Sequence, residues 1–485
     1  MASIRRDRHA VFALTAVIAV VVVVVAFLVP ALGRLAVSPS PAGSPAAYAE
    51  KVTSRELGST LDELAKIASE NGGTRRTGGP GDAATVAYLE AALRMLGYQP
   101  VEDAFQSPVY TDGTGDSLAI SGAAAPTVQD GRDYGALMFS PAGTASGPVV
   151  ALDWDPNATA ADGLGCKQAD FAKVPAGAIV LTRPAACLRR NVLINAQAAG
   201  AVGLVTGYPW LGPGEIRRPT LVDPAGLQIP AIAVDREAAD ALATAATTGA
   251  QVRIATTGST TSGVLRSVIA ELPGVDRSRV VIIGAHLDSS MDGPGIDDDG
   301  SGVAAVLALA QAMAGSTPPV TLRFAFWAAE ESGLHGSTHY VDGLAGSGGP
   351  RVVAYLNADM LGSPNGYRAI YDDANAAPGS SQIRDLFEAD LTAAGLSWKT
   401  IDLFGASDHA PFEQAGIPTG GLFSGANEVI TAADAAQFGR QVGEYADDCY
   451  HLACDGRSNV DAKLLLELVQ SLARVTLEVA AAPPG

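Results

Sequence analysis

The sequence predicts an α/β fold in which helices sandwich a mainly parallel mixed sheet, with a β-rich domain inserted into it. After Gly263, apolar strand-like runs alternate with a helical pattern. Strands that alternate with helices usually pair in parallel, and the helices then cover both faces of the sheet. The predicted elements of this region are strands over 280–283, 320–327 and 352–357 and a helix over 302–313.

Two helical patterns precede this region, over 54–70 and 82–96, where apolar residues recur at the spacing of one helix face. Between about residues 121 and 261 the pattern changes to short β-type runs separated by Gly, Pro and Asp turns. We therefore expect a discontinuous domain over 50–120 and 262–482, interrupted by a β-rich domain over 121–261. The β-type runs are 147–152, 177–182, 202–206 and 229–234.

The composition excludes one large class of function. Of 485 residues, 48% are hydrophobic and 17% are charged, which is enough apolar material for large buried cores. The 51 Asp and Glu residues outnumber the 32 Lys and Arg residues, for a formal net charge of −19. A nucleic-acid binder needs a basic surface to neutralise phosphates, so this balance argues against nucleic acid as a partner. The composition leaves the oligomeric state open.

The N-terminal segment predicts export. Three arginines among the first eight residues precede an uncharged apolar run over 10–29 that ends at Pro30. A helix of this length spans the ~30 Å hydrocarbon core of a bilayer, and the arginines keep the preceding end in the cytoplasm. We assign 1–36 to a signal or membrane-anchor segment and 37–49 to a Ser/Pro/Ala linker with too little apolar content to fold. The body is then extracytoplasmic, anchored through a transmembrane helix or secreted if the segment is cleaved.

The four cysteines are an even number, which in an exported chain indicates disulfide bonds. Nearness in the sequence favours the bridges Cys166–Cys187 and Cys449–Cys454 among the three possible connectivities. Neither spacing fits a zinc ribbon, which needs close C-x-x-C pairs.

Residues of metal-binding type follow the predicted strands where these end. His286 follows the first strand, Glu330 and Glu331 follow the second, and Asp359 follows the third. Ligands of open α/β sheets bind at the carboxyl ends of the strands. Adjacent buried carboxylates repel one another unless a cation lies among them, so the set indicates a metal centre. Its other members are Asp297, Asp298 and Asp299 at the start of the helix and His451 between Cys449 and Cys454.

These motifs resemble those of the M28 family of co-catalytic zinc aminopeptidases, and the inserted region resembles a protease-associated (PA) domain. The resemblance covers nearly all of the chain after the linker and implies a zinc-exopeptidase-like fold. It is tightest in five motifs, AHLDS over 285–289, GIDDDGSG over 295–302, WAAEE over 327–331, LNADM over 356–360 and CYH over 449–451.

The resemblance implies two Zn²⁺ ions per chain, bridged by Asp298. His286 and Asp359 would complete the protein ligands of one ion, and Glu331 and His451 those of the other. Imidazole and carboxylate ligands suit zinc, and carboxylate-rich dinuclear sites also accept Mn²⁺ or Co²⁺.

The resemblance also implies an activity, the hydrolysis of the N-terminal peptide bond of peptides or proteins by a water that the metal ions activate. Glu330 would be the general base and Tyr450 a hydrogen-bond donor to the substrate carbonyl. Asp288 would contact His286 without binding the metal and hold its ring in the required orientation.

Other reactions fit the same scaffold. A carboxypeptidase would need a cationic group for the substrate carboxylate, which the sequence does not place. The acidic motif and the Glu330–Glu331 pair favour a two-metal hydrolase over a single-zinc glutaminyl cyclase. A non-catalytic, receptor-like homologue would not need the complete ligand set.

Two further motifs contain residues of catalytic or metal-binding type. His335 and His339 lie four residues apart, as in a zincin helix, but the Glu that follows the first His of that motif is absent. Ser407-Asp408-His409 is similar to an Asp-His motif near the active site of the family. Asp408 therefore either supports the site or belongs to a surface loop.

Overall fold

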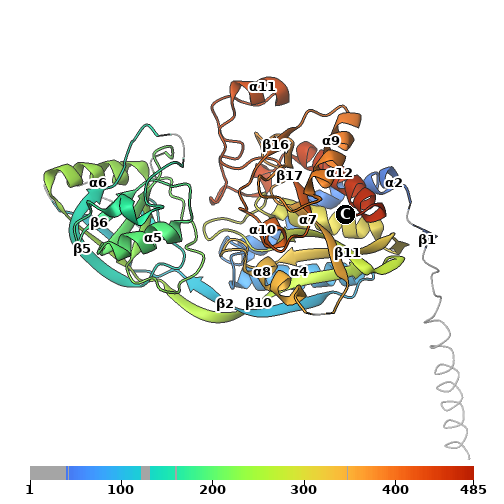
Figure 1. Ribbon diagram of the computed structural model, residues 1–485, viewed down its shortest axis with the longest axis horizontal. Coiled ribbons are helices and arrows are strands. Elements are labelled where there is room, and N and C mark those ends of the chain that lie inside the picture. Colours follow the sequence, from blue (N-terminus) through green and yellow to red (C-terminus); the bar gives the residue numbers. More distant parts are fainter. Residues whose placement is uncertain are drawn as a thin grey trace, which may run out of the picture. The chain divides into compact units, whose positions relative to one another are not determined.

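Residues Ala42–Gly485 form one structural unit (Figure 1). The predicted membrane-anchor run over 10–29 lies outside the residues that the structure describes. In the described ranges no helix is both long and apolar enough to cross a membrane. The computed structural model describes residues 40–41, 43–121, 131–158, 161–212, 214–346 and 348–484.

Helices and strands alternate along much of the described chain. The helices are α2 (Pro45–Ala49), α3 (Ser54–Glu70), α4 (Pro80–Met95), α5 (Arg189–Ala198), α6 (Arg236–Thr248), α7 (Gly300–Met313), α8 (His335–Leu344), α9 (Ser380–Ala393), α10 (His409–Gln414), α11 (Ala432–Phe438) and α12 (Ala462–Ala481), with short 3₁₀ helices at Gln168–Phe171 and Arg457–Asn459. The strands are β1 (Ser40–Pro41), β2 (Val101–Thr111), β3 (Ser117–Ile120), β4 (Tyr134–Ala136), β5 (Gly143–Ala151), β6 (Ile179–Thr182), β7 (Gly203–Gly207), β8 (Ala231–Val234), β9 (Gln251–Thr256), β10 (Ser259–Leu272), β11 (Asp276–His286), β12 (Ser316–Thr317), β13 (Val320–Trp327), β14 (Arg351–Ala358), β15 (Ala369–Tyr371), β16 (Lys399–Ile401) and β17 (Thr419–Phe423).

The larger sheet is mixed and has a parallel centre. Its eight strands lie in the order β16-β15-β17-β14-β11-β13-β10-β2. Strand β11 pairs in parallel with β13 and β14, whereas β10 runs antiparallel to both β13 and β2. The predicted mainly parallel mixed sheet is therefore confirmed. Parallel pairing brings the carboxyl ends of β11, β13 and β14 to the same edge, where His286 lies opposite Trp327.

Helices cover both faces of this sheet because successive side chains of β11 point to opposite sides. Val281 and Ile283 belong to an apolar cluster with side chains of α3, α7 and α12. Val280 and Ile282 belong to another cluster, with side chains of α8 and α10. Helix α7 is buried along almost its whole length, and its sequence is accordingly apolar on all sides.

A second, seven-stranded sheet lies between residues 117 and 256, in the order β3-β9-β5-β6-β7-β8-β4. The four predicted β-type runs coincide with β5, β6, β7 and β8, which pair in parallel. Helices α5 and α6 lie between strands of this sheet in the sequence, α5 between β6 and β7 and α6 between β8 and β9. The predicted bridge Cys166–Cys187 lies within the same part of the chain, and the predicted bridge Cys449–Cys454 is formed in the C-terminal part.

The predicted linker over 37–49 is wrong at its end. Residues 45–49 form helix α2, and Tyr48 is buried in the main apolar cluster. Its hydroxyl accepts a hydrogen bond from the backbone N–H of Gly43 (3.1 Å). Burial of one aromatic side chain orders a segment whose Ser/Pro/Ala composition does not by itself favour structure.

Arg75 holds the segment between β11 and α7 in place. Its buried guanidinium donates from Nε to the carbonyl oxygen of Pro294 (3.0 Å), from Nη2 to that of Gly295 (2.5 Å) and from Nη1 to that of Leu287. Its backbone N–H donates to Oγ of Ser289 (2.9 Å). One cation thus satisfies three carbonyl groups of the segment that leads from the end of β11 toward the acidic motif.

We expect Arg75→Met to lower the free energy of unfolding by about 3–5 kcal/mol, because it leaves buried carbonyl groups and carboxylates without their cation. Urea unfolding in the presence of EDTA measures this loss without a contribution from bound metal. Arg55→Met removes an exposed arginine from α3 and should change stability by about 0.5 kcal/mol or less. Equal losses in the two variants would contradict the positioning role of Arg75.

Candidate metal centre

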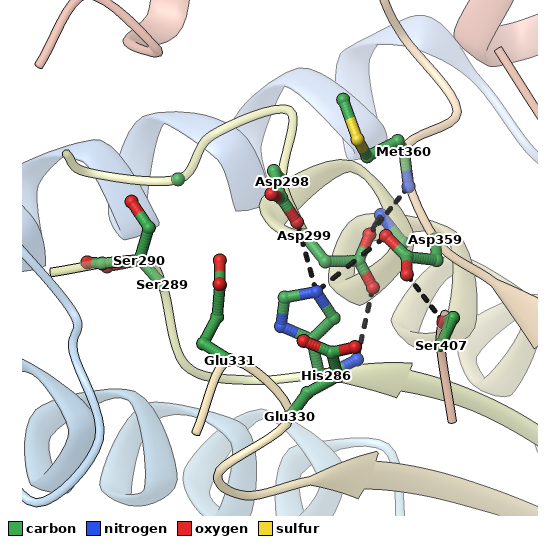
Figure 2. A network of polar contacts seen from close by, with 12 residues as sticks. His286, Ser289, Ser290, Asp298, Asp299, Glu330, Glu331, Asp359, Met360 and Ser407 are labelled. Carbon is green, nitrogen blue, oxygen red and sulfur yellow. Dashed lines mark hydrogen bonds and ion pairs between the residues drawn. The ribbon is translucent and has the colours of Figure 1, made fainter. Parts of the chain in front are cut away.

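Imidazole and carboxylate groups converge at the carboxyl edge of the larger sheet. His286 is the last residue of β11, Asp298 lies just before α7, and Asp359 directly follows β14. Glu331 follows β13, and His451 belongs to the loop that the Cys449–Cys454 disulfide closes. Figure 2 shows Asp298, Asp359 and Glu331 near the ring of His286, together with Asp299 and Glu330.

Asp298 is the centre of this cluster. Its Oδ1 lies 3.1 Å from Nε2 of His286, and its Oδ2 lies 3.0 Å from Nε2 of His451. Oδ1 of Asp359 lies 3.7 Å from the same nitrogen of His286, and Oε2 of Glu331 lies 3.2 Å from that of His451. The five predicted ligand residues are thus brought together, and Asp298 faces each histidine with one carboxylate oxygen. The metal-type donor groups of the structure are His286 with Asp299 and Asp359, and Asp298 with Glu331 and His451.

The buried charges of the cluster shift several pKa values. Burial raises the pKa of Glu331. Burial also opposes protonation of His451, but Glu331 and Asp298 outweigh it and raise the pKa of His451 to about 10. The pKa of His286 lies well above its usual value, because Glu330 and neighbouring carboxylates outweigh burial. Without a metal, therefore, both imidazoles hold protons that offset the negative charge of the carboxylates.

The donor atoms fit zinc. Imidazole nitrogen and carboxylate oxygen are zinc ligands, and the ligand atoms of Asp298, Glu331 and His451 lie within 4.8 Å of one another. Oε1 of Glu331 is buried and has no hydrogen-bond partner among the described residues. A bound cation would pair with that oxygen and take the place of the imidazole protons.

Asp299 has a different role from Asp298. Its Oδ2 accepts a hydrogen bond from the backbone N–H of His286 (3.0 Å), and its Oδ1 accepts from those of Gly302 (2.8 Å) and Met360 (3.2 Å). Asp299 therefore caps α7 and joins the ends of β11 and β14. Although it lies close enough to His286 to share an ion, backbone donors occupy both of its oxygens.

Asp297 and Asp455 fix the backbone of the acidic motif. Asp455 accepts hydrogen bonds from the backbone N–H groups of Asp297 (2.9 Å) and Asp298 (3.1 Å). The carboxylate of Asp297 accepts from the backbone N–H of Gly362 (2.9 Å) and from Oγ of Ser363 (2.9 Å). The three consecutive carboxylates thus have separate partners, and that of Asp298 contacts the imidazole rings of both His286 and His451.

Glu330 lies beside His286 (Figure 2), and its backbone N–H donates to Oδ1 of Asp288 (3.2 Å). Burial raises the pKa of Glu330 well above its usual value, as a proton-transfer group at neutral pH requires. Asp288 presents its main-chain oxygen to Nδ1 of His286 (3.2 Å), while its carboxylate Oδ1 lies 3.8 Å from that nitrogen.

Two hydroxyl groups support the site in ways that the sequence analysis missed. Oγ of Ser407 donates to Oδ2 of Asp359 (2.6 Å; Figure 2), and Oγ1 of Thr77 donates to Oδ2 of Asp288 (2.7 Å). Each hydroxyl lies far along the chain from its partner. Serine and threonine are too common in loops for a local pattern to single these two out.

The structure also shows where Asp408 and the His335/His339 pair lie. Asp408 is buried and accepts a hydrogen bond from Oγ of Ser337 (2.5 Å), so the surface-loop interpretation is wrong. Burial is the main cause that raises the pKa of Asp408 to about 7. Nε2 of His335 contacts the carbonyl oxygen of Val222 (3.0 Å), and His339 stacks on Phe105. Neither histidine belongs to a metal-type donor group of the described residues.

Three residues at the centre have backbone conformations that side chains other than glycine rarely adopt. Ala329 (φ 61°) precedes the Glu330–Glu331 pair, Met360 (φ 54°) follows Asp359, and His451 itself has φ 60°. Such conformations are unfavourable and persist only where surrounding contacts impose them. They turn the chain sharply beside the donor groups.

A further donor group, formed by Asp373, His409 and Glu413, shares no residue with this cluster. Nε2 of His409 lies 3.0 Å from Oδ2 of Asp373, and Oγ1 of Thr419 donates to Oε1 of Glu413 (2.7 Å). The two carboxylates line a separate cavity of about 240 Å³.

An α/β sheet whose parallel strand ends carry a buried His/Asp/Glu cluster, with a further carboxyl group beside it, is typical of a metal-dependent hydrolase. Residues 267–476 match the sequence profile of Peptidase family M28, and residues 145–242 match that of the PA domain. This chain belongs to Peptidase family M28 and carries a PA domain.

Relatives over most of the chain support this assignment. An aminopeptidase of Pseudomonas aeruginosa is 34% identical over 433 residues, which cover 86% of this chain and 79% of the relative. The "Probable lipoprotein aminopeptidase LpqL" of Mycobacterium tuberculosis is 34% identical over 473 residues, covering 92% and 90% of the two chains.

Solved structures share the fold. The aminopeptidase from Aneurinibacillus sp. strain AM-1 has a TM-score of 0.69 at 23% identity, covering 91% of this chain and 97% of that one. The zinc aminopeptidase BSAP from Bacillus subtilis has a TM-score of 0.67 at 21% identity, covering 88% and 95%. Each alignment leaves only about a tenth of this chain uncovered, which is less than the span of residues over which either sheet extends. Both alignments therefore include residues from the parts of the chain that contain the two sheets described above.

Zinc binding should release about two protons per chain near pH 7, because both His286 and His451 must lose a proton to bind a cation. Protons compete with the metal below the raised pKa values of the imidazoles, so zinc affinity should fall as the pH is lowered from 7.5 to 6. Calorimetric titration in buffers of different ionisation enthalpy counts the protons. A count near zero would mean that both imidazoles are neutral before the metal binds.

Proposed function

We propose that this chain is an exported aminopeptidase that uses two metal ions, normally zinc, to hydrolyse the N-terminal peptide bond of peptides or proteins. Its family and its aminopeptidase relatives make it a metallo-aminopeptidase, a hydrolase of peptide bonds. The observation that carries the two-metal proposal is the position of Asp298, whose Oδ1 lies 3.1 Å from Nε2 of His286 and whose Oδ2 lies 3.0 Å from Nε2 of His451. A carboxylate that bridges two ions needs this arrangement.

His286, Asp298 and Asp359 would hold one ion, and Asp298, Glu331 and His451 would hold the other. Mn²⁺ or Co²⁺ would suit the same donors. When bound, the ions supply Lewis acidity that polarises the substrate carbonyl and favours ionisation of water.

The proton transfers belong to Glu330. Its carboxylate would accept a proton from the attacking water and return it to the nitrogen of the leaving amine. Burial in the acidic cluster, which raises its pKa, supports this role. Tyr450 would donate a hydrogen bond to the carbonyl oxygen as negative charge develops there, and its ring lies 3.9 Å from that of His451.

The free amine of the substrate accounts for attack at the N-terminus. A free amine would bind beside one metal ion and neighbouring carboxylates, and a blocked N-terminus would lose this interaction. Asp288 and Ser407 would hold His286 and Asp359 in the orientation that the ions require.

We further propose that the catalytic domain comprises 50–120 and 262–482, with 121–261 as its PA-like insertion. The two separate sheets support this division. The apolar run over 10–29 would direct export, either as an uncleaved anchor or as a cleaved signal, and the relative described as a lipoprotein aminopeptidase supports an extracytoplasmic location.

Glu330→Gln should keep the bound zinc and reduce kcat by about 10²–10⁴-fold, because glutamine preserves the shape of the side chain but cannot accept the proton. The measurements are zinc content per chain and steady-state rates. Glu388→Gln, a matched change on the surface of α9, should leave kcat unchanged. A loss of less than about tenfold in Glu330→Gln would show that another group is the base.

The zinc-loaded, detergent-solubilised chain should release 4-nitroaniline from leucine 4-nitroanilide and not from its N-acetylated form, because acetylation removes the amine that the acidic cluster binds. The absorbance of 4-nitroaniline gives both rates. Comparable rates on the two compounds would contradict recognition of the N-terminus.

A further inference from the structure

Arg217 is a buried cation whose guanidinium contacts no carboxylate among the described residues. It lies between β7 and β8 in the inserted domain and is 5% exposed. Its Nε and Nη1 have no hydrogen-bond partner, and it takes part in no ion pair, within the part of the chain that the structure describes. A guanidinium carries five N–H donors, and burying them unpaired is costly. Such a group indicates a partner that the chain does not itself supply.

The guanidinium lies close to the metal centre. Its Cζ is 5.4 Å from the ring centre of Tyr450 and 5.8 Å from that of Tyr445. The ring of Tyr450 in turn stacks on that of His451, 3.9 Å between centres. The hydroxyl of Tyr445 donates to the carbonyl oxygen of Trp210 (3.2 Å), which ties this loop to the segment that carries Arg217.

The nearby carboxylates already have other partners. Oδ1 of Asp447 accepts from the backbone N–H of Cys449 (2.7 Å) and from Nδ2 of Asn459 (3.0 Å), and its Oδ2 accepts from the same Nδ2 (2.9 Å). Glu215 is exposed, and its Oε2 accepts from the backbone N–H of Gly212 (2.9 Å). The charge of Arg217 acts on Asp447, but neither carboxylate accepts a hydrogen bond from its unpaired donors.

We propose that Arg217 binds a carboxylate of the substrate on the leaving-group side of the scissile bond. That carboxylate is either the C-terminus of a short peptide or the acidic side chain of the residue that follows the cleaved bond. A planar guanidinium matches a carboxylate with two parallel hydrogen bonds. This inference rests on the proposed function, in which the N-terminal amine occupies the acidic cluster and Tyr450 faces the carbonyl.

The charges on the two sides of Tyr450 would fix the orientation in which a peptide substrate binds. In the proposed enzyme the carboxylates that lie beside the metal ions would attract an ammonium group, whereas Arg217 attracts a carboxylate and repels an ammonium group. A dipeptide bound between them would therefore point its amine toward His286 and its carboxylate toward Arg217. The inserted domain would in this way select the leaving group.

The test compares leucine release from Leu-Ala, Leu-Ala-amide and Leu-Glu-amide by the zinc-loaded full chain. The wild type should give a kcat/KM at least about tenfold higher for one of the two carboxylate-bearing substrates than for Leu-Ala-amide. The favoured substrate identifies which carboxylate is bound. Arg217→Gln should remove this preference and change kcat/KM for Leu-Ala-amide by less than about threefold, and Arg217→Lys should keep part of the preference.

Arg189→Gln is the matched control. Arg189 also belongs to the inserted domain and lies over a tyrosine, 5.7 Å from the ring centre of Tyr208, to whose hydroxyl its Nε donates (3.1 Å). This variant should keep the wild-type preference. Equal losses of Arg217→Gln on all three substrates would mean that Arg217 only clamps the two tyrosines, and would overturn the proposal. Absence of any preference in the wild type would overturn it as well.

A binding measurement separates this proposal from the proposed function. N-acetyl-alanine should bind the wild type by calorimetry, and the same compound as its amide, or the Arg217→Gln variant, should show at least about tenfold weaker binding. If this difference is found but no peptide is cleaved, the carboxylate site stands and the aminopeptidase assignment fails. If the difference is absent, the carboxylate site is refuted whatever the activity.

Discussion

The structure depends on one electrostatic constraint, which is that several carboxylates are buried together at the carboxyl edge of a parallel sheet. Such a concentration of negative charge is stable only when positive charge or hydrogen-bond donors meet it. Without metal, protons on His286 and His451 supply part of that charge. Arg75 adds a permanent cation beside the segment between β11 and α7, where its charge acts on Asp288 and Asp299. Two metal ions would replace the protons in the proposed active enzyme.

The rest of the edge is built to keep Asp298 directed at the histidines. Asp299 and Asp297 are occupied by backbone and hydroxyl donors, and Asp455 holds the backbone of the motif from a segment more than 150 residues away. The left-handed backbone at Ala329 and Met360 turns the chain sharply beside the glutamate pair and Asp359. Rigid support of this kind keeps ligands oriented before an ion arrives, which lowers the cost of binding it.

The inserted domain contributes more than a second sheet. Its segment between β7 and β8 approaches the loop that the Cys449–Cys454 disulfide closes, and that loop carries both Tyr450 and His451. A residue of the insertion is therefore adjacent to residues of the metal centre, although more than 200 positions separate them in the chain. In the proposed enzyme this contact would give the PA domain a part in substrate selection, because Arg217 is a buried cation beside Tyr450.

The sequence by itself determined part of the helices and strands and the candidate ligands. The periodicity over 54–70 and the apolar run over 320–327 predict helix α3 and strand β13 with the bounds observed, and the polar residues after each strand predict which side chains meet at the sheet edge. These patterns are local, because the periodicity of apolar side chains in a helix or strand repeats within a few residues. Tertiary structure alone decided the burial of Tyr48, the separate partners of Asp297 and Asp299, and the positions of Arg75, Ser407 and Arg217. Each depends on hydrogen bonds, ring contacts or burial among groups distant in the chain, and no local pattern of residues encodes such a contact.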